Sequence, residues 1–160
     1  MNILFFSLLI LALDQFTKLA IATRFHLGET YEALAPILRF TYVHNPGIAF
    51  GIHFSSALFY GWFAGIASFA LFVYLYRMRH ARFALRLSLA LILGGAIGNL
   101  VDRLAYGYVI DFLDIGFGAK RWPFVFNIAD VGVTIGMVIL MGLAFFEKED
   151  KPVSNEKAPV

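Results

Sequence analysis

The sequence predicts an all-α membrane protein with four transmembrane helices, and two observations indicate this fold class. Of its 160 residues, 60% are hydrophobic and 15% are charged, against roughly 45–50% and about 25% in an ordinary soluble domain. Four long apolar runs divide the chain, and each reaches the ~20 residues with which a helix crosses a bilayer. A soluble fold of this length buries only about 70% of the surface that its unfolded chain exposes, so it could not hide so many apolar residues. The composition therefore disfavours a soluble domain, and it also excludes a disordered chain.

The four apolar runs cover residues 2–23, 57–76, 83–105 and 127–146. A helix satisfies its own backbone hydrogen bonds inside the hydrocarbon layer, so each run is predicted as a helix. The first run contains Ala20-Ile21-Ala22, which is similar to a signal-peptide cleavage site. It lacks basic residues before its apolar core and includes Asp14 and Lys18, so we expect it to be retained.

Basic residues set the predicted orientation, because lysine and arginine gather in cytoplasmic loops. Those near the link between the second and third runs are Arg77, Arg79, Arg82 and Arg86, and the tail adds Lys148, Lys151 and Lys157. Both regions are expected in the cytoplasm, with both termini, while residues 24–56 and 106–126 face outward. We predict a single membrane domain over residues 1–146 and a polar cytoplasmic tail over 147–160.

The first outer segment contains a stretch typical of a β-strand. Residues 37–43 read Ile-Leu-Arg-Phe-Thr-Tyr-Val and are rich in aromatic and β-branched side chains. We expect a small sheet lying at the outer membrane surface, which residues 111–126 would complete.

Ionisable residues inside a membrane span are costly and therefore mark functional positions. Asp14 and Lys18 stand at i and i+4, on one helical face, and a structural pair that neutralises itself is the simpler interpretation. Asn99, Asp102 and Arg103 share a face near the outer end of the third run. The charged side chains of Asp102 and Arg103 could instead extend to the lipid headgroups.

Two further acids lie near the same interface. Asp130 follows Asn127 by three residues where the fourth run begins, and Asn127 suits the cap of that helix. Asp111 lies in an apolar stretch between the last two runs, so Asp102, Asp111 and Asp130 can converge. Two close carboxylates share a proton, the arrangement that an aspartic protease needs. A structural network or a proton pathway would use the same acids.

Other features leave alternatives open. Gly94 and Gly98 form a small-xxx-small pattern that lets another helix approach, and plain packing explains it. Asn45-Pro46-Gly47 is typical of a turn, although the Asn45 amide could bind an extended peptide. Cysteine is absent, the histidines lack metal-site spacing, and there is no phosphate-binding glycine loop. We expect no cofactor, no metal and no nucleic-acid partner.

Taken in order, five segments closely resemble the lipoprotein signal peptidases of bacterial membranes, also called prolipoprotein or type II signal peptidases. These segments are Asp14-Gln15-Phe16-Thr17-Lys18, Asn45-Pro46-Gly47-Ile48-Ala49-Phe50, Gly94-Gly95-Ala96-Ile97-Gly98-Asn99-Leu100-Val101-Asp102-Arg103, Val109-Ile110-Asp111-Phe112 and Phe126-Asn127-Ile128-Ala129-Asp130. Each segment is weak alone, but the ordered set is highly specific and spreads over nearly all of residues 1–146.

The resemblance implies an intramembrane aspartic endopeptidase of the bacterial cytoplasmic (inner) membrane, with its active site at the outer face. Its partners would be diacylglyceryl-modified prolipoproteins, cut on the amino side of the lipidated cysteine, membrane lipids, and globomycin-like inhibitors. The implied fold adds a small outer β-cradle and an outer loop helix. The implied roles are catalytic for Asp111 and Asp130, substrate-binding for Asn45, Gly47, Asn99, Arg103, Asn127 and Ala129, and supporting for Asp14, Lys18 and Asp102.

Residue chemistry favours the same pair of acids. Arg103 beside Asp102 favours the ionised form of that acid and a structural role, whereas Asp111 has no charged neighbour within two residues. The alternative function is a small ion or proton transporter subunit that uses the same acids. A transporter requires a polar route through the membrane, and Asp14 and Lys18 are the charged residues placed deeper.

Overall fold

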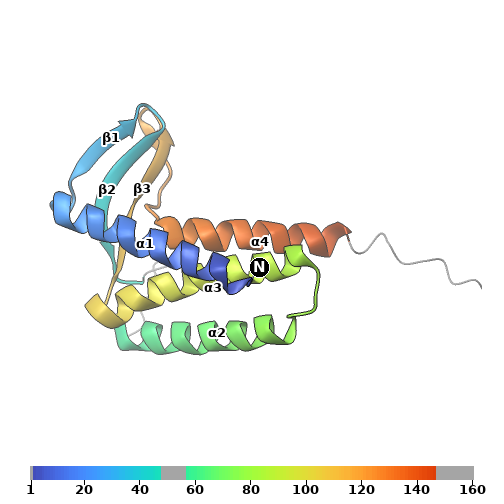
Figure 1. Cartoon of the computed structure of the whole chain (residues 1–160). Helices are drawn as coiled ribbons and strands as arrows, with labels where there is room; N and C mark the ends of the chain where they lie inside the picture. The colour runs from blue at the N-terminus through green and yellow to red at the C-terminus, as the bar shows by residue number, and fades with distance from the viewer. Residues whose placement is uncertain (1, 48–56, 147–160) are drawn as a thin grey trace, which may run out of the picture.

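The computed structural model describes residues 2–47 and 57–146 and shows a helical bundle with a small sheet at one end (Figure 1). Its elements in chain order are α1 (Leu4–Arg24), β1 (Thr30–Leu34), β2 (Leu38–Asn45), α2 (Ala57–Arg77), α3 (Phe83–Tyr106), β3 (Val109–Phe117), β4 (Lys120–Arg121) and α4 (Ile128–Phe146). The predicted tail, 147–160, and the motif residues Ile48, Ala49 and Phe50 lie outside the described residues.

Each of the four apolar runs is a helix close to its predicted bounds. Three of them, α1, α3 and α4, are long and apolar enough to cross a membrane. In α2 the stretch Gly61–Arg77 is apolar but shorter than the other three helices. The fourth transmembrane span therefore stays a prediction.

The α3 helix is the centre of the bundle and contacts α1, α2 and α4. Glycines allow the closest approaches: a Cβ on Gly94 would lie 2.6 Å from the carbonyl oxygen of Ser7 in α1. A Cβ on Gly95 would collide with the carbonyl oxygen of Ala129 in α4. The predicted packing role of Gly94 and Gly98 is confirmed, and it brings the polar end of α3 against both neighbours.

The two ends of the bundle are packed differently. Away from the sheet, the buried core consists of apolar side chains from α1, α2 and α3: Ile3, Leu75, Leu89, Ala90 and Leu93. At the sheet end, the fully buried side chains include Asp14, Lys18, Asp102 and Asn127.

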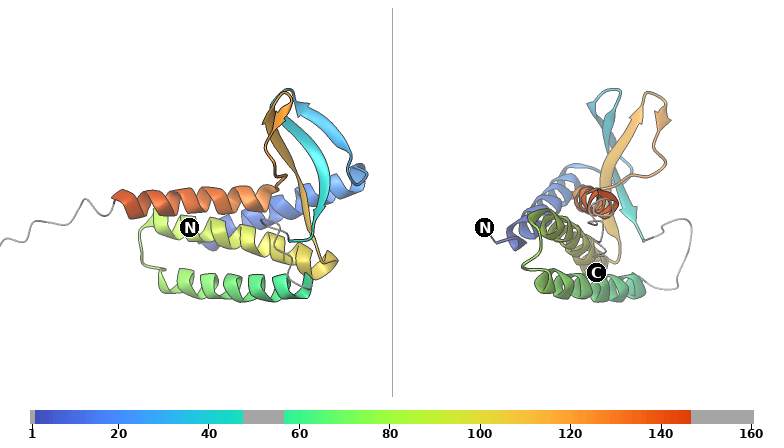
Figure 2. Two further views of the ribbon diagram at one scale, coloured as in Figure 1. Left: turned by 180° about the vertical axis from the view of Figure 1, so that it is seen from behind. Right: turned by 90° about the vertical axis from the view of Figure 1, so that its right-hand side faces the viewer.

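The sheet is antiparallel with strand order β1-β2-β3-β4, and its strands run across the helix axes (Figure 2). The strand predicted at 37–43 is confirmed as β2, and residues 111–126 contribute β3 and β4 as expected. The fully exposed β1 was not predicted. Residues 25–47 and 107–127 form no helix, so the implied outer loop helix has no counterpart in these described segments.

A glycine turn leads directly from the bundle to the sheet. Gly107 has φ 78°, a left-handed conformation that glycine adopts readily, and its N–H donates to the Arg103 carbonyl. The turn ends α3 and starts β3 two residues later, which places Asp111 beside the sheet end of α3.

Candidate active site

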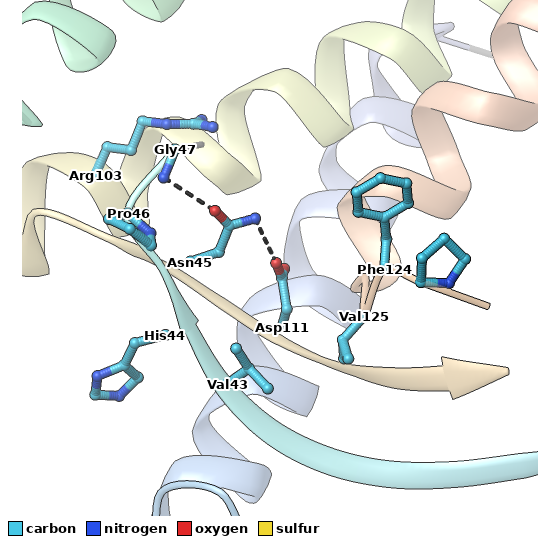
Figure 3. A pocket seen from close by; sticks show the side chains of 10 residues that line it. Val43, His44, Asn45, Pro46, Gly47, Arg103, Asp111, Phe124 and Val125 are labelled. Atoms are coloured by element: carbon cyan, nitrogen blue, oxygen red, sulfur yellow. Dashed lines mark hydrogen bonds between the residues drawn. The ribbon is translucent and has the colours of Figure 1, made fainter. Parts of the chain in front are cut away.

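A cavity of about 500 Å³ opens where the sheet meets the bundle (Figure 3). Its lining comes from β2, the turn that follows it, α3, β3 and the segment before α4: Val43, His44, Asn45, Pro46, Gly47, Arg103, Asp111, Pro123, Phe124 and Val125. Four of the predicted site residues therefore share one cavity.

Asp111 reaches this cavity from β3. It pairs with Val43 in β2, so Asn45, two residues further along, lies on the same face of the sheet. The Asn45 amide nitrogen donates to Asp111 Oδ2 at 2.8 Å (Figure 3). The register shifts between Phe40 and Val43, which indicates a β-bulge just before these residues, and bulges often re-aim side chains next to active sites.

The turn after β2 fixes the orientation of the Asn45 amide. The Gly47 N–H donates to Asn45 Oδ1 at 3.0 Å, so the opposite side of the amide, its nitrogen, faces Asp111. Gly47 has φ 92°, which suits glycine. Asn45 thus serves Asp111 directly, beyond the peptide-binding role considered from the sequence.

Asp130 lies in the first turn of α4, where Asn127 caps the helix as predicted. The Asp130 N–H donates to Asn127 Oδ1 at 3.0 Å, and the Asn127 N–H donates to Asp130 Oδ2 at 3.2 Å. This reciprocal pair is a capping box. The N-terminal end of the helix also stabilises negative charge on Asp130.

Asn127 joins the two acids. Its side-chain nitrogen donates to Asp111 Oδ1 at 2.6 Å, while its backbone N–H binds Asp130. Asn99 adds a donor from α3, because its amide nitrogen lies 2.8 Å from Asp130 Oδ1. The structure therefore brings Asp111 and Asp130 together around one buried asparagine.

Burial raises the pKa of Asp111 from 3.8 to about 7. Hydrogen bonds from Asn45 and Asn127 oppose this rise, and the negative charge of Asp130 adds to it. Near neutral pH Asp111 is therefore partly protonated. The pair can share one proton.

Asp102 is held in a different environment from Asp111. Its Oδ2 accepts from Lys18 at 2.9 Å and from the Ile110 N–H at 3.0 Å, and its Oδ1 accepts from Gln15 at 3.0 Å. Since its side chain is 1% exposed, the alternative that Asp102 extends to the headgroups is wrong. The geometry supports a structural role, in which Asp102 holds the backbone one residue before Asp111.

Asp14 does the same for the other acid. It forms the predicted ion pair with Lys18 at 2.8 Å, and its Oδ1 accepts from the Ala129 N–H at 2.9 Å, one residue before Asp130. Ala129 is fully buried and lines neither cavity described here. Its N–H joins Asp14 to the residue before Asp130, and its substrate-binding role stays a prediction.

Arg103 lines the cavity, and its Nη1 donates to the Asn99 carbonyl at 3.2 Å. Its Nε is buried and has no hydrogen-bond partner within residues 2–47 and 57–146. Sequence reasoning did not single out Gln15, which donates to Asp14, Asp102 and the Gly98 carbonyl. The available signal was an amide side chain within an apolar run.

A second cavity of about 430 Å³ lies against Asp130 and is mostly apolar. Its lining includes Trp122, Phe126 and Ile135, and Phe124 borders both cavities. Each of the two acids thus borders its own cavity. Within the part of the chain that the structure describes, no three histidine or acidic side chains are grouped to hold a metal ion.

Comparisons with known proteins agree with one another. The family profile described as Signal peptidase (SPase) II matches residues 6–146. The lipoprotein signal peptidase of Moorella thermoacetica is 45% identical over 141 residues, covering 88% of this chain and 90% of the relative. That of Burkholderia mallei is 42% identical over 138 residues, covering 84% and 82%. A solved structure described as a bacterial membrane enzyme superposes with a TM-score of 0.78 at 26% identity, covering 98% of this chain and 94% of the other.

Proposed function

Since this chain belongs to the signal peptidase II family, we propose that it is an intramembrane aspartic endopeptidase acting on diacylglyceryl-modified prolipoproteins. It removes the signal peptide by cutting on the amino side of the lipidated cysteine. One observation carries the aspartic mechanism: Asn127 hydrogen-bonds to Asp111 and Asp130 at the same time.

The two acids divide the chemistry between them. Asp130, as the anion at the start of α4, takes a proton from a water molecule as that water attacks the scissile carbonyl carbon. Asp111, as the protonated acid, donates to the carbonyl oxygen and stabilises the developing negative charge. When the tetrahedral intermediate collapses, the C–N bond breaks, the proton held by Asp130 passes to the departing amine, and a hydroxyl of the intermediate returns a proton to Asp111.

The cavity beside Asp111 is proposed to hold the peptide in an extended form. The Arg103 Nε is a buried donor on its wall, suited to bind a peptide carbonyl. Asn45 and Gly47 border the same cavity, and Asn99 and Asn127 hold the acids in place. A globomycin-like cyclic peptide would compete for this space.

The proposed setting is the bacterial cytoplasmic membrane, with residues 1–146 as one domain and α2 as the fourth span. The arginines that follow α2 support a cytoplasmic location for that end of the bundle and for both termini, because basic residues gather in cytoplasmic loops. The sheet end and the acids then lie at the outer face, where the lipid chains of the substrate cysteine are anchored. That anchoring supplies positioning for the scissile bond.

The transporter alternative gains no support from the geometry. The acids discussed here gather at the sheet end, whereas the opposite end of α3 packs Leu89, Ala90 and Leu93 in an apolar core. An aspartic protease needs acids at only one end of the bundle, whereas a proton pathway needs polar groups along its whole length.

Replacing either acid tests the proposal. Asp111→Asn and Asp130→Asn should each lower the cleavage rate of a diacylated prolipoprotein in detergent by about 10²–10⁴-fold, the typical range for loss of general acid–base catalysis. Asp114→Asn is the matched control, because Asp114 lies on the same strand but binds Arg121 at 3.0 Å. Thermal unfolding of each variant verifies its fold.

Normal cleavage by both Asp111→Asn and Asp130→Asn would reject the aspartic mechanism. Proton flux through vesicles that disappears in the same variants would favour the transporter.

A further inference from the structure

Lys18 is a buried cation with no part in the chemistry proposed above. Its side chain is 2% exposed, and its ammonium lies 2.8 Å from Asp14 Oδ2, 2.9 Å from Asp102 Oδ2 and 3.0 Å from Asn99 Oδ1. An ammonium has three N–H donors, and these three acceptors use all of them. Neutralising Asp14 and Asp102 explains two of the contacts but leaves the contact with Asn99 unexplained.

The contact with Asn99 determines which way that amide points. An ammonium can donate but cannot accept, so the Asn99 atom that faces Lys18 must be the oxygen. The amide nitrogen must then face the other side, where it lies 2.8 Å from Asp130 Oδ1. The Asn127 side-chain nitrogen also lies 3.0 Å from Asn99 Oδ1, but its two N–H groups have Asp111 Oδ1 and the Ile110 carbonyl as other acceptors. Among the residues that the structure describes, Lys18 has no other acceptor for its third N–H, so it holds the Asn99 nitrogen towards Asp130, and a donor there favours the ionised acid.

The amides of the other two asparagines are also held in one orientation, but by donors of the backbone. The Asp130 N–H fixes Asn127, and the Gly47 N–H fixes Asn45. Those anchors are supplied by the helix cap and the turn themselves. Asn99 is instead held by two side chains, Lys18 and Asn127, and a substitution of Lys18 removes the charged one.

We propose that Lys18 is a positioning residue, whose ammonium locks the Asn99 amide with its nitrogen towards Asp130 and so keeps the shared proton on Asp111. This inference rests on the proposed protease function. Without Lys18, Asn127 can keep its bonds to Asp111 and the Ile110 carbonyl while the Asn99 amide rotates by 180°. The rotated amide presents its oxygen, which can bond only a protonated Asp130. The proton would then occupy the acid that has to act as the base.

Other charges around this point come from three elements. Asp14 lies on α1, Asp102 and Arg103 on α3, and Asp111 on β3. Loss of the Lys18 charge would by itself favour protonated acids, so the test has to separate charge from amide orientation. A double-mutant cycle with Asn99 does so, because Asn99→Ala removes the amide and leaves the charges in place.

The cycle combines Lys18→Met with Asn99→Ala and measures kcat, KM and the pH profile of cleavage. Lys18→Met alone should lower kcat by about 10–100-fold, the usual effect of losing an orienting partner, and move the acid limb of the profile to higher pH. In the Asn99→Ala background the same substitution should cause only the smaller shift that comes from the lost charge. Equal shifts in both backgrounds would show that Lys18 acts through its charge alone and would overturn the proposal.

Gln15→Met is the matched control. Gln15 binds Asp14 and Asp102 within the same buried cluster, and no hydrogen bond to Asn99 is among its contacts. This variant should lower the unfolding temperature and leave the pH profile unchanged. A profile that moves with Gln15→Met as it does with Lys18→Met would contradict the proposal, because any damage to the cluster would then suffice.

Lys18→Met leaves two buried carboxylates without their cation, so the cycle is repeated in an Asp14→Asn background, where the net charge is balanced. Failure to fold there as well would show that Lys18 serves folding and not positioning. The protease function is judged by a separate result: cleavage that survives Asp111→Asn and Asp130→Asn rejects it. If those two variants are inactive but Lys18→Met has the same effect with and without Asn99, only the role of Lys18 is rejected.

Discussion

The two ends of α3 are built on different principles. At one end, Leu89, Ala90 and Leu93 pack with apolar side chains of α1 and α2 through shape alone. At the other, Asn99 and Asp102 are held by directed hydrogen bonds, in which the orientation of each group depends on the next. The comparison indicates that the apolar end stabilises the bundle. The polar end contributes directed hydrogen bonds that hold the acids and amides in one arrangement.

The largest expected effect on stability is at the apolar end. Leu93→Ala removes a fully buried side chain, and the cavity should lower the free energy of unfolding by about 2–5 kcal/mol. Leu104→Ala on the same helix is the control, because Leu104 is 68% exposed. Denaturation in detergent measures both. The pH profile of cleavage should be unchanged, and a shift caused by Leu93→Ala would mean that the two ends are not independent.

Gly95 lies between the two regions and tests their connection. Gly95→Ala would push the new methyl group into the Ala129 carbonyl, one residue before Asp130, and should cost about 1–3 kcal/mol of stability. Because α4 must shift, kcat should fall as well. Gly142→Ala, on α4 itself, places its methyl in open space and should leave both quantities near the wild-type values. Equal behaviour of the two variants would refute the close-packing argument.

The smallest expected effect is the response of the polar end to pH. Because burial raises the pKa of Asp111 to about 7, this acid loses its proton as the pH rises through that value. If the protonated form of Asp111 is the active one, kcat/KM should fall towards tenfold per pH unit on the alkaline side. Cleavage assays at intervals of about one pH unit, from about pH 5 to about pH 9, measure this slope. A flat profile across the range would contradict the shared proton.

The sequence predicts the parts of this molecule that depend on local composition. Hydropathy alone locates the helices, and the cost of charge in a membrane points to Asp14, Lys18, Asp102 and Asp130. The strand at 37–43 is predictable because its β-branched and aromatic residues are concentrated there.

The rest depends on tertiary contacts that local pattern does not encode. The strand β1 is exposed at every residue, so it lacks the alternation that marks a half-buried strand, and it is defined by pairing with β2. The Asn99 amide oxygen accepts a hydrogen bond from Lys18, 81 residues away. Gln15 reaches Asp102 only because α1 and α3 approach so closely.

The hydrogen bond from the Ala129 N–H to Asp14 joins the first helix to the last across 115 residues. During synthesis α1 leaves the ribosome first and α4 last, so nothing can hold Asp130 in place until the final helix has entered the bilayer. Under the proposed function, a nascent chain that still lacks α4 has only one of the two acids and cannot cleave. Proteolysis would then begin only after the last helix has joined the bundle.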